Sequence, residues 1–105
     1  MVSIFLIGGN KTMKLVFAFT EFDVDILDVP SDIISNIKKV CKQFDKWLYD
    51  KNNKETWNKE RRVFCFRGDM FVYWLNEYYL KDEEKAHMIA SQPDIYDHNL
   101  PTVWY

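Results

Sequence analysis

The chain has 105 residues, of which 48% are hydrophobic and 17% aromatic, and its formal net charge is −2 at pH 7. The length fits a single domain, and the apolar content excludes a disordered chain because it offers enough surface to offset the entropy of ordering. So small a charge does not predict long-range attraction to nucleic acid or to an anionic membrane. We therefore expect residues 1–105 to form one domain.

The N-terminal stretch precedes a strand that we expect over residues 15–20, which are rich in β-forming side chains. The apolar part of residues 1–12 is shorter than a signal-peptide core or a membrane span, and no basic leader precedes it. This predicts a cytoplasmic protein. Because Met13 stands directly before the strand, residues 1–12 are either an N-terminal extension or an extra edge strand.

A second strand is predicted over residues 21–29, where apolar and acidic side chains alternate. The alternation slips at Ile26 and Leu27, which marks either a bulge or the end of the strand. One face would be apolar and the other a solvent-facing acidic row. We expect this row to comprise Glu21, Asp23, Asp25 and Asp28.

A long amphipathic helix is predicted over residues 32–50, with Ser31 as its N-cap. Apolar side chains recur there at spacings of three and four, and Trp47 widens the apolar stripe. Lysines occupy the opposite side. A polar loop to about residue 60 follows, and residues 61–67 read as a further strand that ends at Gly68.

Asp69 is expected to cap a second helix, on which Phe71, Trp74, Leu75 and Tyr78 share a face, whereas Tyr73 and Tyr79 lie off that face. A third, shorter helix is predicted over residues 82–90, and a last strand over residues 102–105. The order β-β-α-β-α-α-β predicts an α+β fold, in which two or three helices pack on one face of a small, mostly antiparallel sheet.

The two cysteines, Cys41 and Cys65, each lie in an apolar run and outside any C-x-x-C pair, so we expect buried free thiols. No spacing in the chain matches a metal or cofactor motif, and we expect neither group. A protein-binding surface is the stronger prediction, since acidic residues can orient a partner and exposed aromatic residues can anchor it. The candidate partner-binding residues are Glu21, Asp23, Asp25, Asp28, Trp57, Tyr73 and Tyr79.

Two alternatives remain open at this point. Lys54, Trp57, Arg61 and Arg62 combine bases with an aromatic ring, which is the pattern that stacks on and neutralises a single-stranded nucleic acid. A small enzyme that uses Asp94 and His98 is the other alternative, and it would require the two side chains to converge in a cleft. A homodimer is also compatible with the largely apolar second helix.

Three segments of the chain, with the sequences MKLVFAFTEF, FDKWLYD and FVYWLNE, begin at Met13, Phe44 and Phe71. They resemble small proteins carried by bacterial mobile elements, chiefly anti-CRISPR inhibitors and, less closely, toxin-immunity proteins. The resemblance extends over residues 13 to 90 and assigns no role to individual residues. It implies a non-enzymatic inhibitor that occludes a nuclease or toxin.

Overall fold

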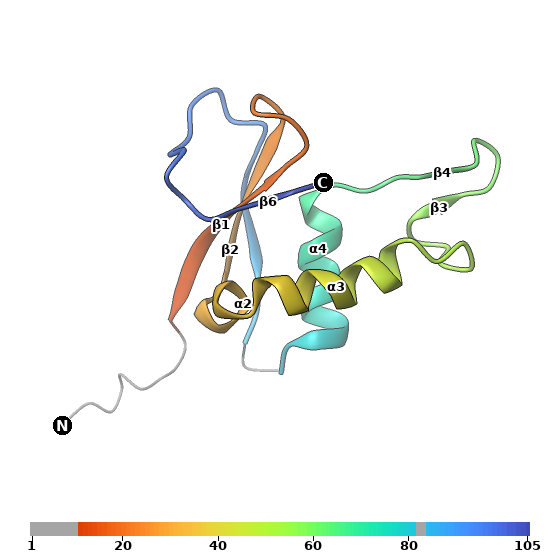
Figure 1. Ribbon diagram of the computed structural model, residues 1–105, viewed down its shortest axis with the longest axis horizontal. Coiled ribbons are helices and arrows are strands. Elements are labelled where there is room, and N and C mark those ends of the chain that lie inside the picture. Colours follow the sequence, from red (N-terminus) through yellow and green to blue (C-terminus); the bar gives the residue numbers. More distant parts are fainter. Residues whose placement is uncertain (1–10, 82–83) are drawn as a thin grey trace.

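The computed structural model describes residues 11–81 and 84–105 and shows an α+β fold. A four-stranded mixed sheet has the order β5-β2-β1-β6, and a separate two-stranded sheet is formed by β3 and β4 (Figure 1). Helices α2, α3 and α4 and the π-helical turn η1 complete the described part. No helix in that part is both long and apolar enough to cross a membrane.

The centre of the sheet is a hairpin. Strands β1 (Thr12–Ala18) and β2 (Val24–Pro30) pair antiparallel along their whole length. The hydroxyl of Thr20 closes the connection by accepting the backbone N–H groups of Phe22 and Asp23. The strand predicted over residues 21–29 therefore loses its first residues to a turn.

The edge strands are β5 (His87–Ser91), antiparallel to β2, and β6 (Thr102–Trp104), parallel to β1. The last predicted strand is confirmed, but the helix predicted over residues 82–90 is wrong where the structure describes it; residues 82–83 lie outside the described part. Because β2 is buried, its backbone groups need partners on both sides, and β5 supplies them. The pairing register of β2 and β5 shifts between Ile26 and Leu27, so the slip in the sequence marks an irregularity within the strand and not its end.

The predicted helix over residues 32–50 is present but broken. It forms α2 (Ser31–Ser35) and α3 (Ile37–Leu48), which are separated by Asn36 with φ −115° and ψ 25°. The side-chain amide of Asn36 donates to the Asp32 carbonyl at 3.0 Å, one turn back. Ser31 is not the N-cap that the sequence predicted, because it lies inside α2 and no side chain caps that helix end.

Strands β3 (Trp57–Asn58) and β4 (Val63–Phe64) form a small hairpin arm that projects away from the main sheet (Figure 1). The strand predicted over residues 61–67 is thus shorter than expected and does not join the main sheet. Since the arm consists of two strands of two residues each, it buries few of its own side chains. Cys65 is exposed there, and the prediction that it is buried is wrong, whereas Cys41 is half-buried.

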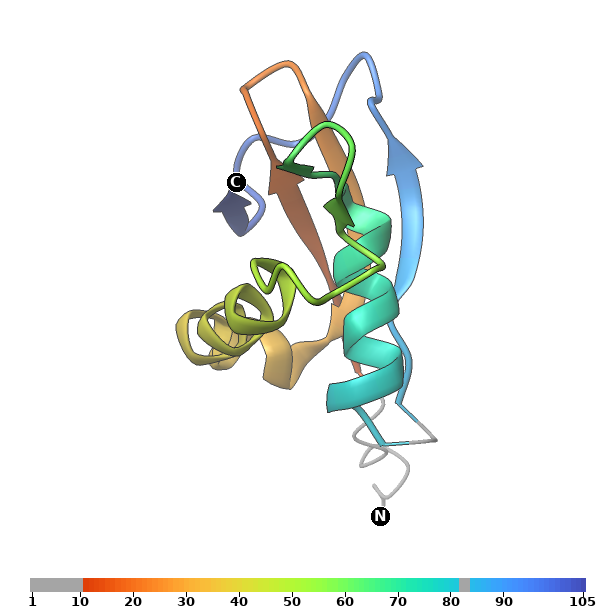
Figure 2. The same ribbon diagram turned by 90° about the vertical axis from the view of Figure 1, so that its right-hand side faces the viewer.

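Helix α4 (Gly68–Trp74) continues directly into η1 (Leu75–Tyr79) and lies across β2 and β5 (Figure 2). The opposite face of the sheet is covered in part by the segment that joins β5 to β6, through Tyr96 and Leu100. The main core lies between the sheet and the helices. Its buried side chains are Leu15, Phe17, Leu27, Val29, Ile33, Val40, Phe44, Leu48, Phe71, Trp74, Leu75 and Ala86.

Candidate protein-binding surface

The acidic row predicted on the second strand does not form one surface. Asp25 is completely buried, and Asp23 is only partly exposed and forms an ion pair with Arg67. Side chains alternate along β2, so Asp25 points to the helix-covered face and Asp28 to the opposite one. Glu21 is exposed in the hairpin turn. The prediction of a solvent-facing acidic row is therefore wrong, because both faces of this central strand are covered.

Asp25 is held by three hydrogen bonds, two from the start of α4 and one from β5. Its Oδ1 accepts from Arg67 Nη2 at 2.9 Å and from Ser91 Oγ at 2.8 Å, and its Oδ2 accepts from the backbone N–H of Gly68 at 2.8 Å. The carboxylate therefore caps the first residue of α4, where Asp69 was the predicted cap. The absence of a side chain at Gly68 permits this contact, since a Cβ there would lie 2.8 Å from Asp25 Cβ.

Asp23 extends the same network towards solvent. Its Oδ1 lies 2.8 Å from Arg67 Nη2 and accepts from Gln92 Nε2 at 3.2 Å. The hydrogen bond from Arg67 lowers the pKa of Asp23 against the opposing effect of desolvation, and the two carboxylates raise the pKa of the Arg67 guanidinium. This network joins β2, β5 and the start of α4, so we assign Asp23 and Asp25 to the architecture of the fold.

Trp57 lies in the hairpin arm and is half-buried. Its ring packs on Phe64 with the centroids 4.8 Å apart, and Lys51 Nζ lies 5.2 Å from the Trp57 centroid. Both neighbours belong to the same arm and its base. The ring is thus partly occupied by contacts that stabilise the arm, which leaves less of it for an outside partner.

The two tyrosines predicted off the apolar face of the second helix have different surroundings. Tyr73 is 38% exposed, whereas Tyr79 is half-buried against the core and its ring lies 5.4 Å from that of Trp74. Tyr78, predicted on the buried face, is 61% exposed. The π-helical turn explains the exchange: Leu80 N–H bonds to the Leu75 carbonyl, and the wider turn moves Tyr79 inward and Tyr78 outward.

Tyr73 and Tyr78 meet a third large ring, that of Trp47 from α3. The centroid separations are 6.1 Å for Trp47 and Tyr73, 5.7 Å for Trp47 and Tyr78, and 6.3 Å for Tyr73 and Tyr78. We call these three residues the aromatic cluster. Trp47 is partly buried against the core, and its inner side packs on Phe44 at 6.1 Å. The cluster is therefore anchored to the core through Trp47, and its two tyrosines are exposed to solvent.

Sequence reasoning missed Trp47 and Tyr78 as surface candidates. The available signal for Trp47 was its position at the margin of the apolar stripe of α3, where a side chain is covered on one side only. No signal in the sequence revealed the π-helical turn that exposes Tyr78.

The surroundings of the aromatic cluster carry negative charge. The pKa of the Tyr73 hydroxyl is raised, first by the neighbouring Tyr78 hydroxyl, and further by the carboxylates of Glu55 and Glu77. Both glutamates are exposed. The cluster therefore offers the protonated Tyr73 hydroxyl and apolar rings beside two acidic side chains, an arrangement that is complementary to the Arg and Lys side chains of a partner.

Asp94 and His98 line one hollow of about 280 Å³ together with Glu21 and Tyr96. Within the described residues no hydrogen bond joins Asp94 to His98; the ring of His98 lies instead 4.1 Å from that of Tyr96. Both side chains are exposed to solvent. Residues 11–81 and 84–105 contain no group of three or more His, Cys, Asp or Glu side chains placed to hold a metal ion.

Comparison with known proteins gives no relative: no family model matches this chain, and no curated protein or solved structure is significantly similar to it.

Proposed function

We propose that this chain is a non-enzymatic protein-binding inhibitor, which blocks a nuclease or toxin by stoichiometric contact through its aromatic cluster. One observation carries the proposal. Trp47, Tyr73 and Tyr78 converge from α3, α4 and η1 into a single group of large rings, while Tyr73 and Tyr78 remain 38% and 61% exposed. Trp and Tyr are the residues most enriched among those that dominate binding energy at protein interfaces.

The anchoring of the rings favours a binding role. Tyr73 and Trp47 are held by packing, so little side-chain entropy remains to be lost when a partner covers them. Truncation of an anchor of this kind costs about 2 kcal/mol or more of binding free energy. Since 1.4 kcal/mol corresponds to about a tenfold change in Kd, we expect each tyrosine truncation to weaken binding roughly 30-fold.

The charge around the cluster supports the choice of target. A nuclease must hold phosphates, and it does so with a surface rich in Arg and Lys. Glu55 and Glu77 beside the cluster match such a surface, and Arg also stacks on aromatic faces. In this proposal the two glutamates take the orienting role that the sequence had assigned to the acidic residues of the second strand.

The test is a capture experiment followed by an activity assay. Tagged protein is incubated with a nuclease-treated bacterial lysate that contains candidate defence nucleases and toxins, and bound proteins are identified by mass spectrometry. We expect one stoichiometric partner whose activity is abolished at one equivalent of the inhibitor. Tyr73→Ala and Tyr78→Ala should lose this partner, whereas Phe22→Ala should retain it, because Phe22 is 84% exposed but lies in the β1–β2 turn. Equal capture by all three variants would contradict the role of the aromatic cluster.

A second candidate function is nucleic-acid binding by the hairpin arm. The observation that favours it is the exposure of Arg61 and Arg62 on an arm that projects from the body, and of Lys54 in the loop that leads into the arm (Figure 1). It predicts a salt-dependent mobility shift with a single-stranded oligonucleotide, weakened by a combined Arg61→Ala and Arg62→Ala change. Absence of a shift at low salt would remove this candidate.

A further inference from the structure

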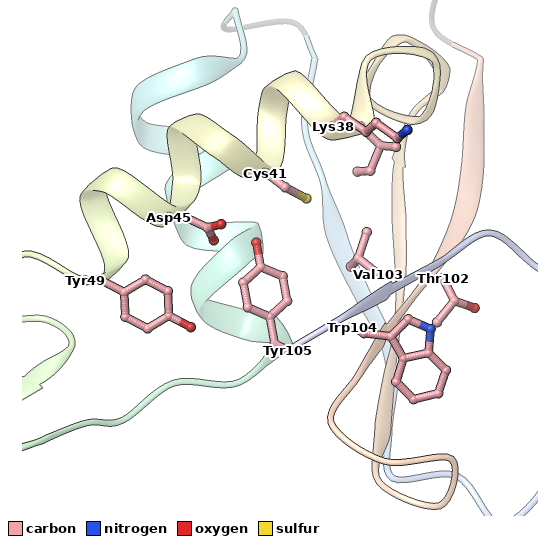
Figure 3. A pocket seen from close by; sticks show the side chains of 9 residues that line it. Lys38, Cys41, Asp45, Tyr49, Thr102, Val103, Trp104 and Tyr105 are labelled. Carbon is pink, nitrogen blue, oxygen red and sulfur yellow. The ribbon is translucent and has the colours of Figure 1, made fainter.

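A groove lies between helix α3 and the edge strand β6, which run side by side (Figure 3). Its volume is about 480 Å³. Ile37, Lys38, Cys41 and Asp45 contribute its helical wall, and residues 102–105 its strand wall. The groove contains none of the three rings of the aromatic cluster, so it is a separate surface.

The backbone of β6 is available on the side that faces away from β1. Val16 N–H donates to the Pro101 carbonyl at 2.9 Å, and Tyr105 N–H donates to the Ala18 carbonyl at 2.7 Å, so residues 101 and 105 face β1. Backbone groups alternate along a strand, and those of Thr102 and Trp104 therefore point away from β1. Since β6 ends the strand order of the sheet, no further strand in the described part of the chain pairs with this edge.

Two of the polar groups that line the groove are uncharged at neutral pH. Burial raises the pKa of the Cys41 thiol and that of the Tyr105 hydroxyl, so both groups keep their protons. The Tyr105 hydroxyl points towards the Asp45 carboxylate across the groove (Figure 3). Protonated thiol and hydroxyl groups can hydrogen-bond to a polypeptide backbone that enters the groove.

Positive charge gathers along the outer rim of the helical wall. Lys38, Lys39 and Lys42 are exposed and line the hollow that adjoins the groove, and among residues 11–81 and 84–105 Asp45 is the one acidic residue that lines it. An occupant that carries carboxylates on the side facing α3 would match this rim. Trp104, which also lines the groove, is 62% exposed, and a side chain on an added neighbouring strand could pack on it.

We propose that this groove accepts an extended, acidic segment of a partner protein, which pairs with β6 as a fifth strand and fills the space beneath α3. Addition of a strand to an exposed edge beside a groove is a recurrent mode of peptide recognition, in which main-chain hydrogen bonds give affinity and alternate side chains give specificity. The inference does not depend on the aromatic cluster, and the two surfaces can be tested separately.

The probe is a displayed library of random linear peptides, selected against the full chain. We expect enrichment of acidic, proline-free sequences. A selected peptide should protect the amides of Thr102 and Trp104 from hydrogen exchange and slow the alkylation of Cys41. Thr102→Pro removes only an outward N–H and should weaken binding about tenfold, the equivalent of one hydrogen bond.

Two further variants keep the test decisive if Thr102→Pro disturbs the fold. Lys38→Glu should weaken the selected peptides and Tyr78→Ala should leave them unchanged, which separates this groove from the aromatic cluster. The proposal is overturned if no sequence is enriched, or if bound peptides leave both amides unprotected. It is also overturned if sedimentation shows that the free protein dimerises and that Thr102→Pro abolishes the dimer, because a second copy would then occupy the edge.

Discussion

Replacement of the buried carboxylate by an amide, Asp25→Asn, should destabilise the protein more than any other change to its acidic residues. Asparagine has nearly the same shape, but it lacks the charge and presents an NH₂ group to one side. That group must face either the N–H of Gly68 or the donors of Arg67 and Ser91, which now all bond to the carboxylate. At least one buried donor is then left without an acceptor.

The magnitude follows from the partners. Breaking a buried ion pair by removing one member costs about 3–5 kcal/mol. Arg67 keeps Asp23 as a second partner in a half-exposed position, so the lower end applies, and we expect a loss of about 3 kcal/mol. The total free energy of unfolding of a domain of this size is about 5–15 kcal/mol. At roughly 4–8 °C per kcal/mol, Tm should fall by about 12–24 °C.

Urea unfolding followed by tryptophan fluorescence measures this loss, since the chain contains four Trp residues. The midpoint should fall while the slope with denaturant stays unchanged. Asp28→Asn is the matched control, because Asp28 lies on the same strand and contributes no bond to the network. A loss below about 1 kcal/mol for Asp25→Asn would refute the reasoning, since that is the net value of one ordinary hydrogen bond.

Three other predictions concern neighbouring features. Gly68→Ala should lower the urea midpoint by the equivalent of about 1–3 kcal/mol, because the new Cβ overlaps the buried carboxylate side chain; an unchanged midpoint would show that the helix start can shift. Folding lowers the pKa of Asp23 from its ordinary value of 3.8, so the ionised carboxylate stabilises the fold above pH 3.8 and this contribution is lost as the pH falls through the lowered pKa. The urea midpoint of Asp23→Asn should therefore depend less on pH between pH 5 and 3 than that of the original protein. Mass spectrometry should find iodoacetamide on exposed Cys65 well before half-buried Cys41, whose thiol pKa is raised, and equal rates would contradict this.

Local patterns predicted the elements whose partners lie nearby. The two strands β1 and β2 and the helical span of α2 and α3 follow from β-forming composition, alternation and three- and four-residue spacing, and these elements are confirmed with shifted ends. The turn between the two strands was not predicted. Strand β5 could not be derived in the same way. The composition of residues 87–91 is compatible with a helix. They form a strand because the backbone N–H and C=O groups along the free edge of β2 need hydrogen-bond partners.

Which candidate residues are exposed depends on tertiary packing, which the local sequence does not reveal. An acidic residue on an alternating strand is normally solvent-facing, but Asp25 points to a face where Arg67 and the start of α4 supply donors. The sequence separation of these partners, 42 and 43 residues, leaves no local trace. Likewise, one extra residue per turn in η1 is enough to exchange Tyr78 and Tyr79 between surface and core.

Helix α4 connects the hydrogen-bond network of Asp25 to the aromatic cluster, and this connection affects the interpretation of charge-reversal experiments. Asp25 accepts a hydrogen bond from Gly68, the first residue of α4, and Tyr73 lies near the end of the same helix. An Asp25→Lys change would therefore displace Tyr73 relative to Trp47 and weaken a partner that never touches β2. Loss of binding in that variant cannot place Asp25 in an interface. Only the exposed side chains of the cluster, changed one at a time in a protein of normal stability, report on direct contact.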